Sequence, residues 1–138
     1  MAMIYVFDTS AWLTYIEDEP GSTTIHEILE QTGHGVQVYI FFMAVMEVFY
    51  ISAQRSHIVE AYNRVNLILS LPITYHDSSL ALSIVAAKIK SRNRVSNADS
   101  WMAALTKMVN GTLVHKDPEF EQLGHEISLY PLPYKKQR

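Results

Sequence analysis

The sequence predicts an α/β protein in which helices cover both faces of a mainly parallel sheet. Four short runs of aliphatic and aromatic residues have the composition of buried strands, and segments with helical spacing separate them. Strands that alternate with helices are typical of parallel sheets. With 138 residues, 49% hydrophobic and 18% charged, the chain has the size and composition of one globular domain. We therefore expect a single domain over residues 1–138, with a core at about 3–132 and a basic tail at 133–138.

Each element has a local signal. The strand candidates are the apolar runs at 3–7, 36–42, 112–115 and 127–132, with 71–75 as a shorter candidate. The helix candidates are the segments at 11–16, 23–31, 43–55, 58–70, 77–90 and 96–110. We expect Asp77 to cap the fifth helix, whose apolar face would carry Leu80, Ile84, Val85 and Ile89.

Composition excludes several classes of function. Cys is absent, so disulfides, thiolate zinc sites and a cysteine nucleophile are excluded. The six histidines form no zinc-hydrolase spacing, and the glycine-rich loops of nucleotide-binding proteins are absent, as is the G-x-S-x-G turn of hydrolases. The longest apolar run, 38–46, is much shorter than the ~18 residues of a membrane span, and no secretion signal is seen. We expect a cytoplasmic protein that contacts no membrane.

The charge is distributed unevenly although the net charge is only −3. Residues 1–54 hold seven acids and no Lys or Arg, whereas residues 55–138 hold eleven bases and seven acids. Seven of these bases lie in two short segments: Lys88, Lys90, Arg92 and Arg94, then Lys135, Lys136 and Arg138. This pattern fits a metal site beside a track for a polyanion, and solvated helix ends with a frayed tail are the alternative.

Four carboxylates are notable for their positions. Asp8 and Asp117 each follow a predicted strand, and ligands of open parallel sheets bind beyond the carboxyl ends of the strands. Glu47 is the only charged residue in 31–54 and shares its predicted helix with apolar neighbours. Asp99 lies in the first turn of another predicted helix.

Each of these acids also has a structural alternative. Asp8 and Asp117 can cap helices, and Ser96 with Asp99 fits an S-x-x-D capping box. Glu47 could lie exposed on a helix edge. In combination, four acids at one end of a sheet would repel one another unless a cation lay between them. Oxygen ligands favour Mg²⁺ or Mn²⁺ over zinc.

The same acids lie in segments that resemble the PIN domain, most closely the VapC-type toxins of prokaryotic toxin–antitoxin pairs. VFDTSAWL resembles the family's first strand followed by Asp-x-Ser-Ala, and MAVMEVFY resembles the helix with the second acid. VSNADSWMAALTKMVNGTLVHKDPEF is similar to the third and fourth motifs. The resemblance extends from about residue 3 to 132.

The resemblance implies a three-layer α/β/α sandwich and a metal-dependent endoribonuclease with Mg²⁺ or Mn²⁺ as its cofactor. It also implies a homodimer that a small cognate antitoxin inhibits. The residues that it marks as catalytic and metal-binding are Asp8, Glu47, Asp99 and Asp117, with Ser10 a polar neighbour of the first. The family often has Thr where this chain has His115, which could bind phosphate, shift the pH profile or end a strand.

The resulting hypothesis is hydrolysis of an RNA phosphodiester by metal-activated water. The expected substrate contacts are Ser10, His115 and the basic residues Lys88, Lys90, Arg92 and Arg94. Trp12 and Trp101 could stack a base or pack in the core. An antitoxin could insert a basic side chain among the acids and dock a helix near Trp12 and Tyr15.

Other classes of function remain as alternatives. They are a housekeeping PIN-domain nuclease and an inactive PIN-fold module that only binds a protein. A receiver domain needs an early pair of acids, and a phosphotransferase with an Asp nucleophile needs D-x-D. The sequence has Asp8-Thr9-Ser10 instead, which favours neither of these two.

Overall fold

Five parallel strands form the centre of the molecule, in the order β3-β2-β1-β4-β5. The structure is a computed structural model that describes residues 2–135. The strands are β1 (Met3–Phe7), β2 (Val36–Phe41), β3 (Thr74–His76), β4 (Thr112–His115) and β5 (Ser128–Pro131). All four pairings between neighbouring strands are parallel, which confirms the predicted sheet.

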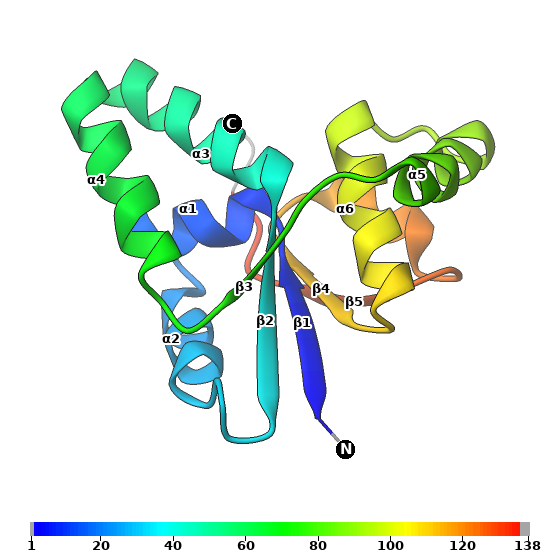
Figure 1. Cartoon of the computed structure of the whole chain (residues 1–138), viewed down its shortest axis with the longest axis horizontal. Coiled ribbons are helices and arrows are strands. Elements are labelled where there is room, and N and C mark those ends of the chain that lie inside the picture. Colours follow the sequence, from blue (N-terminus) through cyan, green and yellow to red (C-terminus); the bar gives the residue numbers. More distant parts are fainter. Residues whose placement is uncertain (1, 136–138) are drawn as a thin grey trace.

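Helices cover both faces of this sheet, as expected for parallel strands that need long crossover connections (Figure 1). The α-helices are α1 (Thr9–Glu17), α2 (Ser22–Glu30), α3 (Phe42–Arg55), α4 (Ile58–Leu69), α5 (Leu80–Arg92) and α6 (Asn97–Met108). A short 3₁₀ helix, η1 (Pro118–Leu123), follows β4. Helices α1 to α4 lie on one side and α5 and α6 on the other, so the predicted three-layer α/β/α sandwich is confirmed.

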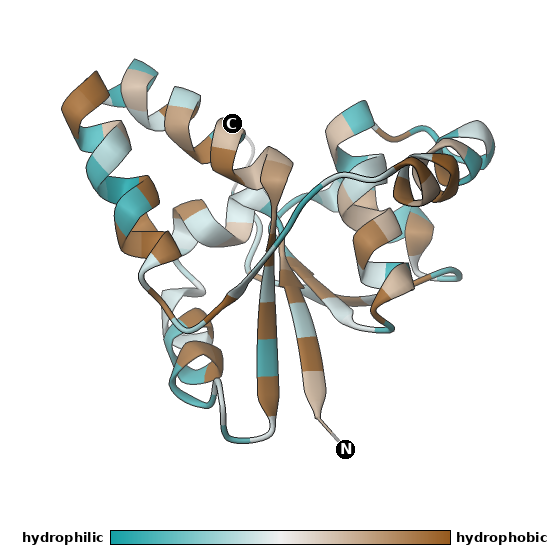
Figure 2. Ribbon diagram, in the orientation of Figure 1, coloured by the Kyte–Doolittle hydropathy of each residue, from teal (hydrophilic) through white to brown (hydrophobic). Residues whose placement is uncertain are grey.

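The core is formed around the two central strands. Val6 and Phe7 of β1 and Leu113 and Val114 of β4 are fully buried, because layers of helices cover both faces of these strands. Figure 2 shows that β1 and β2 are largely hydrophobic, whereas the outer helices alternate between hydrophobic and hydrophilic residues. The apolar runs of the sequence therefore became the centre of the sheet.

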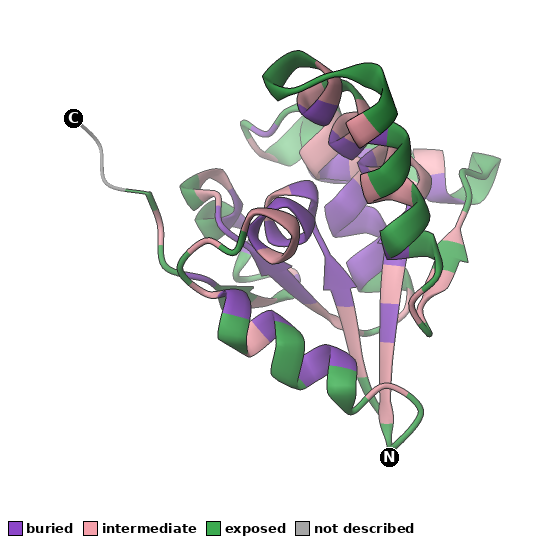
Figure 3. Ribbon diagram, turned by 90° about the vertical axis from the view of Figure 1, so that its left-hand side faces the viewer, coloured by how far each residue is buried: buried purple, intermediate pink, exposed green. Residues whose placement is uncertain are grey.

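The helices bury one face each. In α2 the buried side chains include Ile25, Ile28 and Leu29, at the spacing of one helix face. Figure 3 shows the resulting bands of buried and exposed residues along α2. Within residues 2–135, no helix combines the length and apolar composition that a bilayer crossing needs.

The start of α5 differs from the prediction. The Ser79 side chain accepts the N–H of Leu82 at 3.1 Å, so Ser79 is the cap and the helix begins at residue 80. Asp77 instead accepts the N–H of Ser78 at 2.7 Å in the preceding turn. The expected capping role of Asp77 is wrong because a second cap residue lies closer to the helix.

The apolar face of α5 is also rotated relative to the prediction. Its buried residues are Leu82, Ala86 and Ile89, whereas Leu80 is 81% and Ile84 is 50% exposed. Helix α5 packs on α6, and this packing decides which face is covered. Of the expected face, Ile89 is buried and Val85 is half-buried.

The topology places a site where β1 and β4 end. The chain leaves β1 towards one face of the sheet and enters β4 from the other, so these two strands flank the switch point of the fold. The backbone N–H of Asp8 donates to the carbonyl of Val114 at 3.0 Å, which holds the two strand ends together.

Candidate active site

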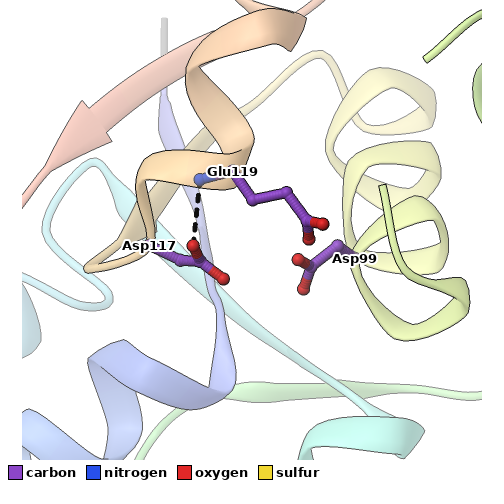
Figure 4. Close-up of side chains that lie close together, drawn as sticks. All are labelled: Asp99, Asp117 and Glu119. Atoms are coloured by element: carbon purple, nitrogen blue, oxygen red, sulfur yellow. Dashed lines mark hydrogen bonds between the residues drawn. The ribbon is translucent and has the colours of Figure 1, made fainter. Parts of the chain in front are cut away.

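Three carboxylates face one another at this end of the sheet (Figure 4). Asp99 comes from the first turn of α6, and Asp117 and Glu119 come from the start of η1. One oxygen atom from each of the three lies within 4.8 Å of the others. We call these residues the acidic cluster. Three converging carboxylate oxygens are the kind of donor set that hard divalent cations prefer.

Asp99 can face the cluster because its capping box is only half formed. The Ser96 hydroxyl accepts the N–H of Asp99 at 3.1 Å, as the sequence predicts. The N–H of Ser96, however, lies 3.4 Å from Glu119 Oε2 and donates to it. Glu119 thus takes the role that the box would assign to Asp99, and the Asp99 carboxylate is left to the acidic cluster.

Asp117 acts as a cap and as a member of the cluster at once. Its Oδ1 accepts the N–H of Glu119 at 2.9 Å, the bond drawn in Figure 4. Pro118 occupies the first position of η1, as expected after an Asp cap. The capping bond also holds Glu119 close to Asp117, so both carboxylates point toward Asp99.

Asp8 lies at the end of β1 and is 5% exposed. Ser10 Oγ donates to Asp8 Oδ2 at 2.7 Å and accepts the N–H of Lys116 at 2.9 Å. Asp8 is the N-cap of α1, so it fills the structural role that the sequence offers as an alternative. The Ser10 hydroxyl therefore connects the acid after β1 with the backbone after β4.

Burial and mutual repulsion raise the pKa values of two of these acids. Desolvation, together with the charge of Glu47, raises the pKa of Asp8 to about 6, although the Ser10 hydrogen bond opposes the shift. Desolvation, a hydrogen bond with Glu119 and the charges of Asp8, Glu119 and Asp117 raise the pKa of Asp99 to about 9. The four predicted acids and Glu119 thus form one electrostatic unit whose ionised form needs a cation.

Glu47 lies on α3 at the edge of this unit. It is half-buried, and its Oε1 accepts the Thr9 hydroxyl at 2.7 Å. Its helix neighbours Ala44 and Val48 are fully buried. The structure therefore gives Glu47 a hydroxyl partner and a place near Asp8, outside the three-residue acidic cluster.

His115 lies behind the site. It is fully buried, and its Nδ1 accepts the N–H of Asp117 at 3.1 Å, so the neutral ring carries its proton on Nε2. Nε2 has no hydrogen-bond partner among residues 2–135, and the ring packs edge-on to Phe120 with 5.1 Å between centroids. Burial lowers the pKa of His115, which favours this neutral form. The ring thus holds the Asp117 backbone from the interior.

The four basic residues expected to contact RNA lie at and just beyond the C-terminal end of α5. Lys90 Nζ donates to a backbone carbonyl at 2.6 Å, and Arg92 pairs with Glu126. Lys88 and Arg94 are exposed, and the Arg94 backbone N–H is bound to η1. Arg94 therefore lies beside the helix that carries two of the clustered acids.

The second basic segment lies at the end of the chain. Its Lys135 pairs with Glu19, whereas Lys136 and Arg138 lie outside the described residues.

The two tryptophans have different environments. Trp12 is fully buried, with its ring centroid 4.9 Å from that of Phe7. The hypotheses that it stacks a base or anchors a partner helix are therefore wrong. Trp101 is half-buried and stacks on Phe41 with 5.6 Å between centroids. Tyr15 is also half-buried.

Glu119 is the one residue of the acidic cluster that the sequence did not predict. Its signal is the order Asp-Pro-Glu after a strand, because a Pro at the first helical position places the next residue in the first turn beside the cap. The contact between Glu119 and Asp99 joins positions that are twenty residues apart, and only the packing of α6 beside η1 creates it.

The comparisons with known proteins agree with this geometry. The family model of the PIN domain matches residues 5–126, and the chain therefore belongs to the PIN domain family. A search of curated protein sequences finds no match.

Solved structures of VapBC and VapC proteins share the fold. A chain of VapBC2 from Rickettsia felis, bound to a DNA fragment from its promoter, has a TM-score of 0.79 and 18% identity, over 95% of this chain and 100% of that chain. DNA-bound VapBC from Salmonella typhimurium gives 0.78 and 17%, over 95% and 98%. VapC20 from Mycobacterium tuberculosis, described as a sarcin–ricin loop cleaving toxin, gives 0.70 and 17%, over 88% and 95%. These similarities establish the shared fold.

Proposed function

We propose that the protein is a metal-dependent endoribonuclease and the toxin of a toxin–antitoxin pair. The observation that carries this proposal is the acidic cluster at the switch point of a PIN-domain fold. The similarity to VapC20, which is described as a sarcin–ricin loop cleaving toxin, supports a toxin that cleaves its target.

The residues present fit a divalent cation. The cluster offers only carboxylate oxygens, and the pKa of Asp99 is raised to about 9 by burial and by the neighbouring acids. Asp99, Asp117 and Glu119 would hold Mg²⁺ or Mn²⁺, with Asp8 and Glu47 completing the negative surroundings. Such an ion supplies an activated water and offsets the charge of the attacked phosphate.

The chain's own residues would position this chemistry. Ser10 orients the Asp8 carboxylate, and Thr9 orients Glu47. His115 holds the backbone N–H of Asp117, so it acts as a positioning residue. Arg94, exposed next to η1, is the best placed of the four predicted bases to meet an RNA backbone, with Lys88, Lys90 and Arg92 further along α5.

We extend the proposal to the partners and the place of action. A small cognate antitoxin would hold the enzyme inactive, as the VapBC descriptions of the similar structures suggest. The protein would act as a homodimer in the cytoplasm.

The test combines a cleavage assay with a matched pair of variants. The pure protein should cut single-stranded RNA in Mg²⁺ or Mn²⁺ and lose this activity in EDTA. Asp99→Asn should lower the rate more than about 100-fold, because it removes a metal ligand. Asp77→Asn, an exposed acid outside the cluster, should match the wild type. Near wild-type cleavage by Asp99→Asn would falsify the metal-ligand role.

A growth experiment separates the toxin from the alternatives. Expression of the chain alone should arrest growth, and co-expression with the product of a neighbouring gene should restore it. Cleavage in vitro without growth arrest would indicate a housekeeping nuclease. Neither cleavage nor arrest would indicate an inactive binding module.

A further inference from the structure

A cavity of about 320 Å³ adjoins the acidic cluster on the side of α1. The polar side chains that line it are Ser10, Glu19, Arg55, Lys116, Asp117 and Lys135. Asp117 belongs to the acidic cluster and Ser10 donates to Asp8, so these two residues form a wall between the cavity and the acids. We call this space the Lys116 cavity. Its volume lies in the range of about 300–1,000 Å³ that is typical of small-molecule sites.

Lys116 is an unusual lining residue because its side chain is largely buried while its ammonium has only a distant ionic partner. Its side chain is 3% exposed, and the nearest carboxylate oxygen, on Glu19, lies 3.9 Å from Nζ. This distance is too long for a hydrogen bond, and Nζ donates to no other residue in 2–135. The three side-chain N and O atoms in 2–135 that are fully buried without a hydrogen bond do not include Lys116 Nζ, so the ammonium is open to the cavity. An anion that enters the cavity can therefore accept from its three N–H donors.

The surroundings of Lys116 favour a phosphate group. Arg55 and Lys135 also line the cavity and are 46% and 62% exposed, so basic groups reach from the interior to its mouth. Glu19 lies between two of these bases, 3.0 Å from Lys135 and 3.9 Å from Lys116. The Glu19 carboxylate thus lies between the two ammonium groups. A phosphate that enters the cavity would either share these ammonium groups with Glu19 or displace its carboxylate from them.

We propose that the Lys116 cavity binds a phosphate group of the nucleic-acid strand next to the bond that the acidic cluster cleaves. This inference rests on the proposed function and adds a substrate subsite to it. Because Asp117 borders the cavity and also belongs to the cluster, a strand whose bond lies at the cluster could extend into the cavity with a neighbouring phosphate. The space beyond Lys116 is large enough for a nucleotide, with Leu13, Pro118 and Tyr134 as its less polar surfaces.

The test measures RNA binding separately from cleavage. Binding of a fluorescent eight-nucleotide single-stranded RNA is measured by fluorescence anisotropy in Ca²⁺ over a range of salt concentrations. The RNA is checked after each titration to verify that it is intact. Lys116→Met should raise the Kd about tenfold or more and reduce the slope of log K against log salt by about 0.7, as expected for one lost phosphate contact on a single strand. Glu19→Gln should lower the Kd several-fold, because it removes the competing carboxylate.

Two controls show whether a weaker affinity comes from the loss of the subsite, from the loss of any positive charge, or from a folding defect. Lys107→Met removes an exposed lysine far from the cavity and should match the wild type in Kd and slope. Lys116→Met should melt at or above the wild-type temperature, because Met keeps the apolar stem and removes a desolvated charge. If that variant does not fold, Glu19→Gln decides alone, and an unchanged Kd then overturns the proposal. Wild-type Kd and slope in Lys116→Met overturn it directly.

Two further readouts identify the ligand and isolate the inference. Inorganic phosphate and a nucleoside monophosphate are added as competitors. If millimolar phosphate displaces the RNA as completely as unlabelled RNA does, the site binds free phosphate and the strand assignment is wrong. Cleavage in Mn²⁺ is measured in parallel. If RNA binding depends on Lys116 but the protein does not cleave RNA, the subsite stands and the proposed activity is wrong. If the protein cleaves RNA but neither cleavage nor binding changes in Lys116→Met, the activity stands and the subsite is wrong.

Discussion

The hydrogen bond made by the backbone N–H of Ser96 determines whether the Asp99 carboxylate caps its helix or faces the acidic cluster. This N–H donates to Glu119, so the Asp99 carboxylate is not needed to complete the capping box. The same contact brings Glu119 beside Asp99. Burial, a hydrogen bond with Glu119 and the charges of the neighbouring acids then raise the pKa of Asp99 to about 9. A residue with an ordinary capping signature thereby becomes the most perturbed acid of the site.

Glu119→Gln should lower the pKa of Asp99 from about 9, because it removes one of the repelling charges. Affinity for Mn²⁺ should fall about 10- to 100-fold, as for the loss of a metal-site carboxylate. An NMR titration of the Asp99 carboxyl and calorimetry with Mn²⁺ measure the two effects. Glu121→Gln, exposed on the same short helix, serves as the control. An Asp99 pKa that stays near 9 in Glu119→Gln would show that Glu119 does not contribute to the shift.

His115→Ala should destabilise the protein by about 2–4 kcal/mol, because it leaves a cavity and removes the acceptor of the Asp117 N–H. It should also weaken Mn²⁺ binding by loosening Asp117. His115→Asn keeps an acceptor in place and should recover much of the Mn²⁺ affinity even where stability stays low. Urea unfolding and calorimetry separate the two effects. Equal Mn²⁺ affinity in the wild type and in His115→Ala would rule out a positioning role.

At the scale of the elements, local pattern and long-range packing contribute differently. The strands and helices could be predicted because their signals, apolar runs and helical spacing, are local to each segment. The covered face of α5 could not, because α6 selects it and leaves Leu80 and Ile84 exposed. Likewise Asp8 and Asp117 were predictable from strand ends, whereas Glu119 and the Lys116 cavity depend on contacts between distant segments.

The cap of α5 provides a direct comparison between the predicted and the observed helix start. Ser79→Ala should lower the free energy of unfolding by about 1 kcal/mol, because it leaves the N–H of Leu82 without its acceptor. Asp77→Ala should change it by less than half as much, since Asp77 only bonds within the preceding turn. Urea unfolding of both variants measures the difference. A larger effect at Asp77 would restore the original assignment.

A pair of ionic contacts joins three of the helices on one side of the sheet. Glu17 of α1 pairs with Arg55 of α3 at 2.9 Å and with Arg64 of α4 at 3.3 Å. Burial alone would raise the pKa of Glu17, but the hydrogen bonds and charges of the two arginines outweigh it and lower the pKa. The acidic first part of the chain is thus balanced in space by bases from later segments, which the linear charge pattern does not show.

For the whole molecule, the raised pKa values make stability depend on pH and on metal. Asp8 and Asp99 retain protons in the folded state up to about pH 6 and pH 9, whereas in the unfolded state both release them near pH 4. The unfolded state therefore binds fewer protons between these values, and the metal-free protein should lose stability as the pH rises from about 4 to about 9.

Mn²⁺ should reverse this loss, because it binds the ionised cluster of the folded state. Melting temperatures in EDTA should fall from pH 5 to pH 9, and the increase caused by Mn²⁺ should be largest at the alkaline end. Asp99→Asn, which has no carboxyl to titrate, should flatten the EDTA curve. A wild-type melting temperature in EDTA that rises over this range would contradict the electrostatic account of the site.

The position of β4 in the sheet has a consequence for synthesis. Strand β4 pairs directly with β1, yet β1 begins at Met3 and β4 only at Thr112, and Asp117 and Glu119 follow β4. A growing polypeptide that ends before β4 lacks the partner on one side of its central strand and has only part of its acidic cluster. If the proposed activity holds, a product that stops before β4 should be inactive, and activity should appear only once β4 and η1 have been made and packed beside β1.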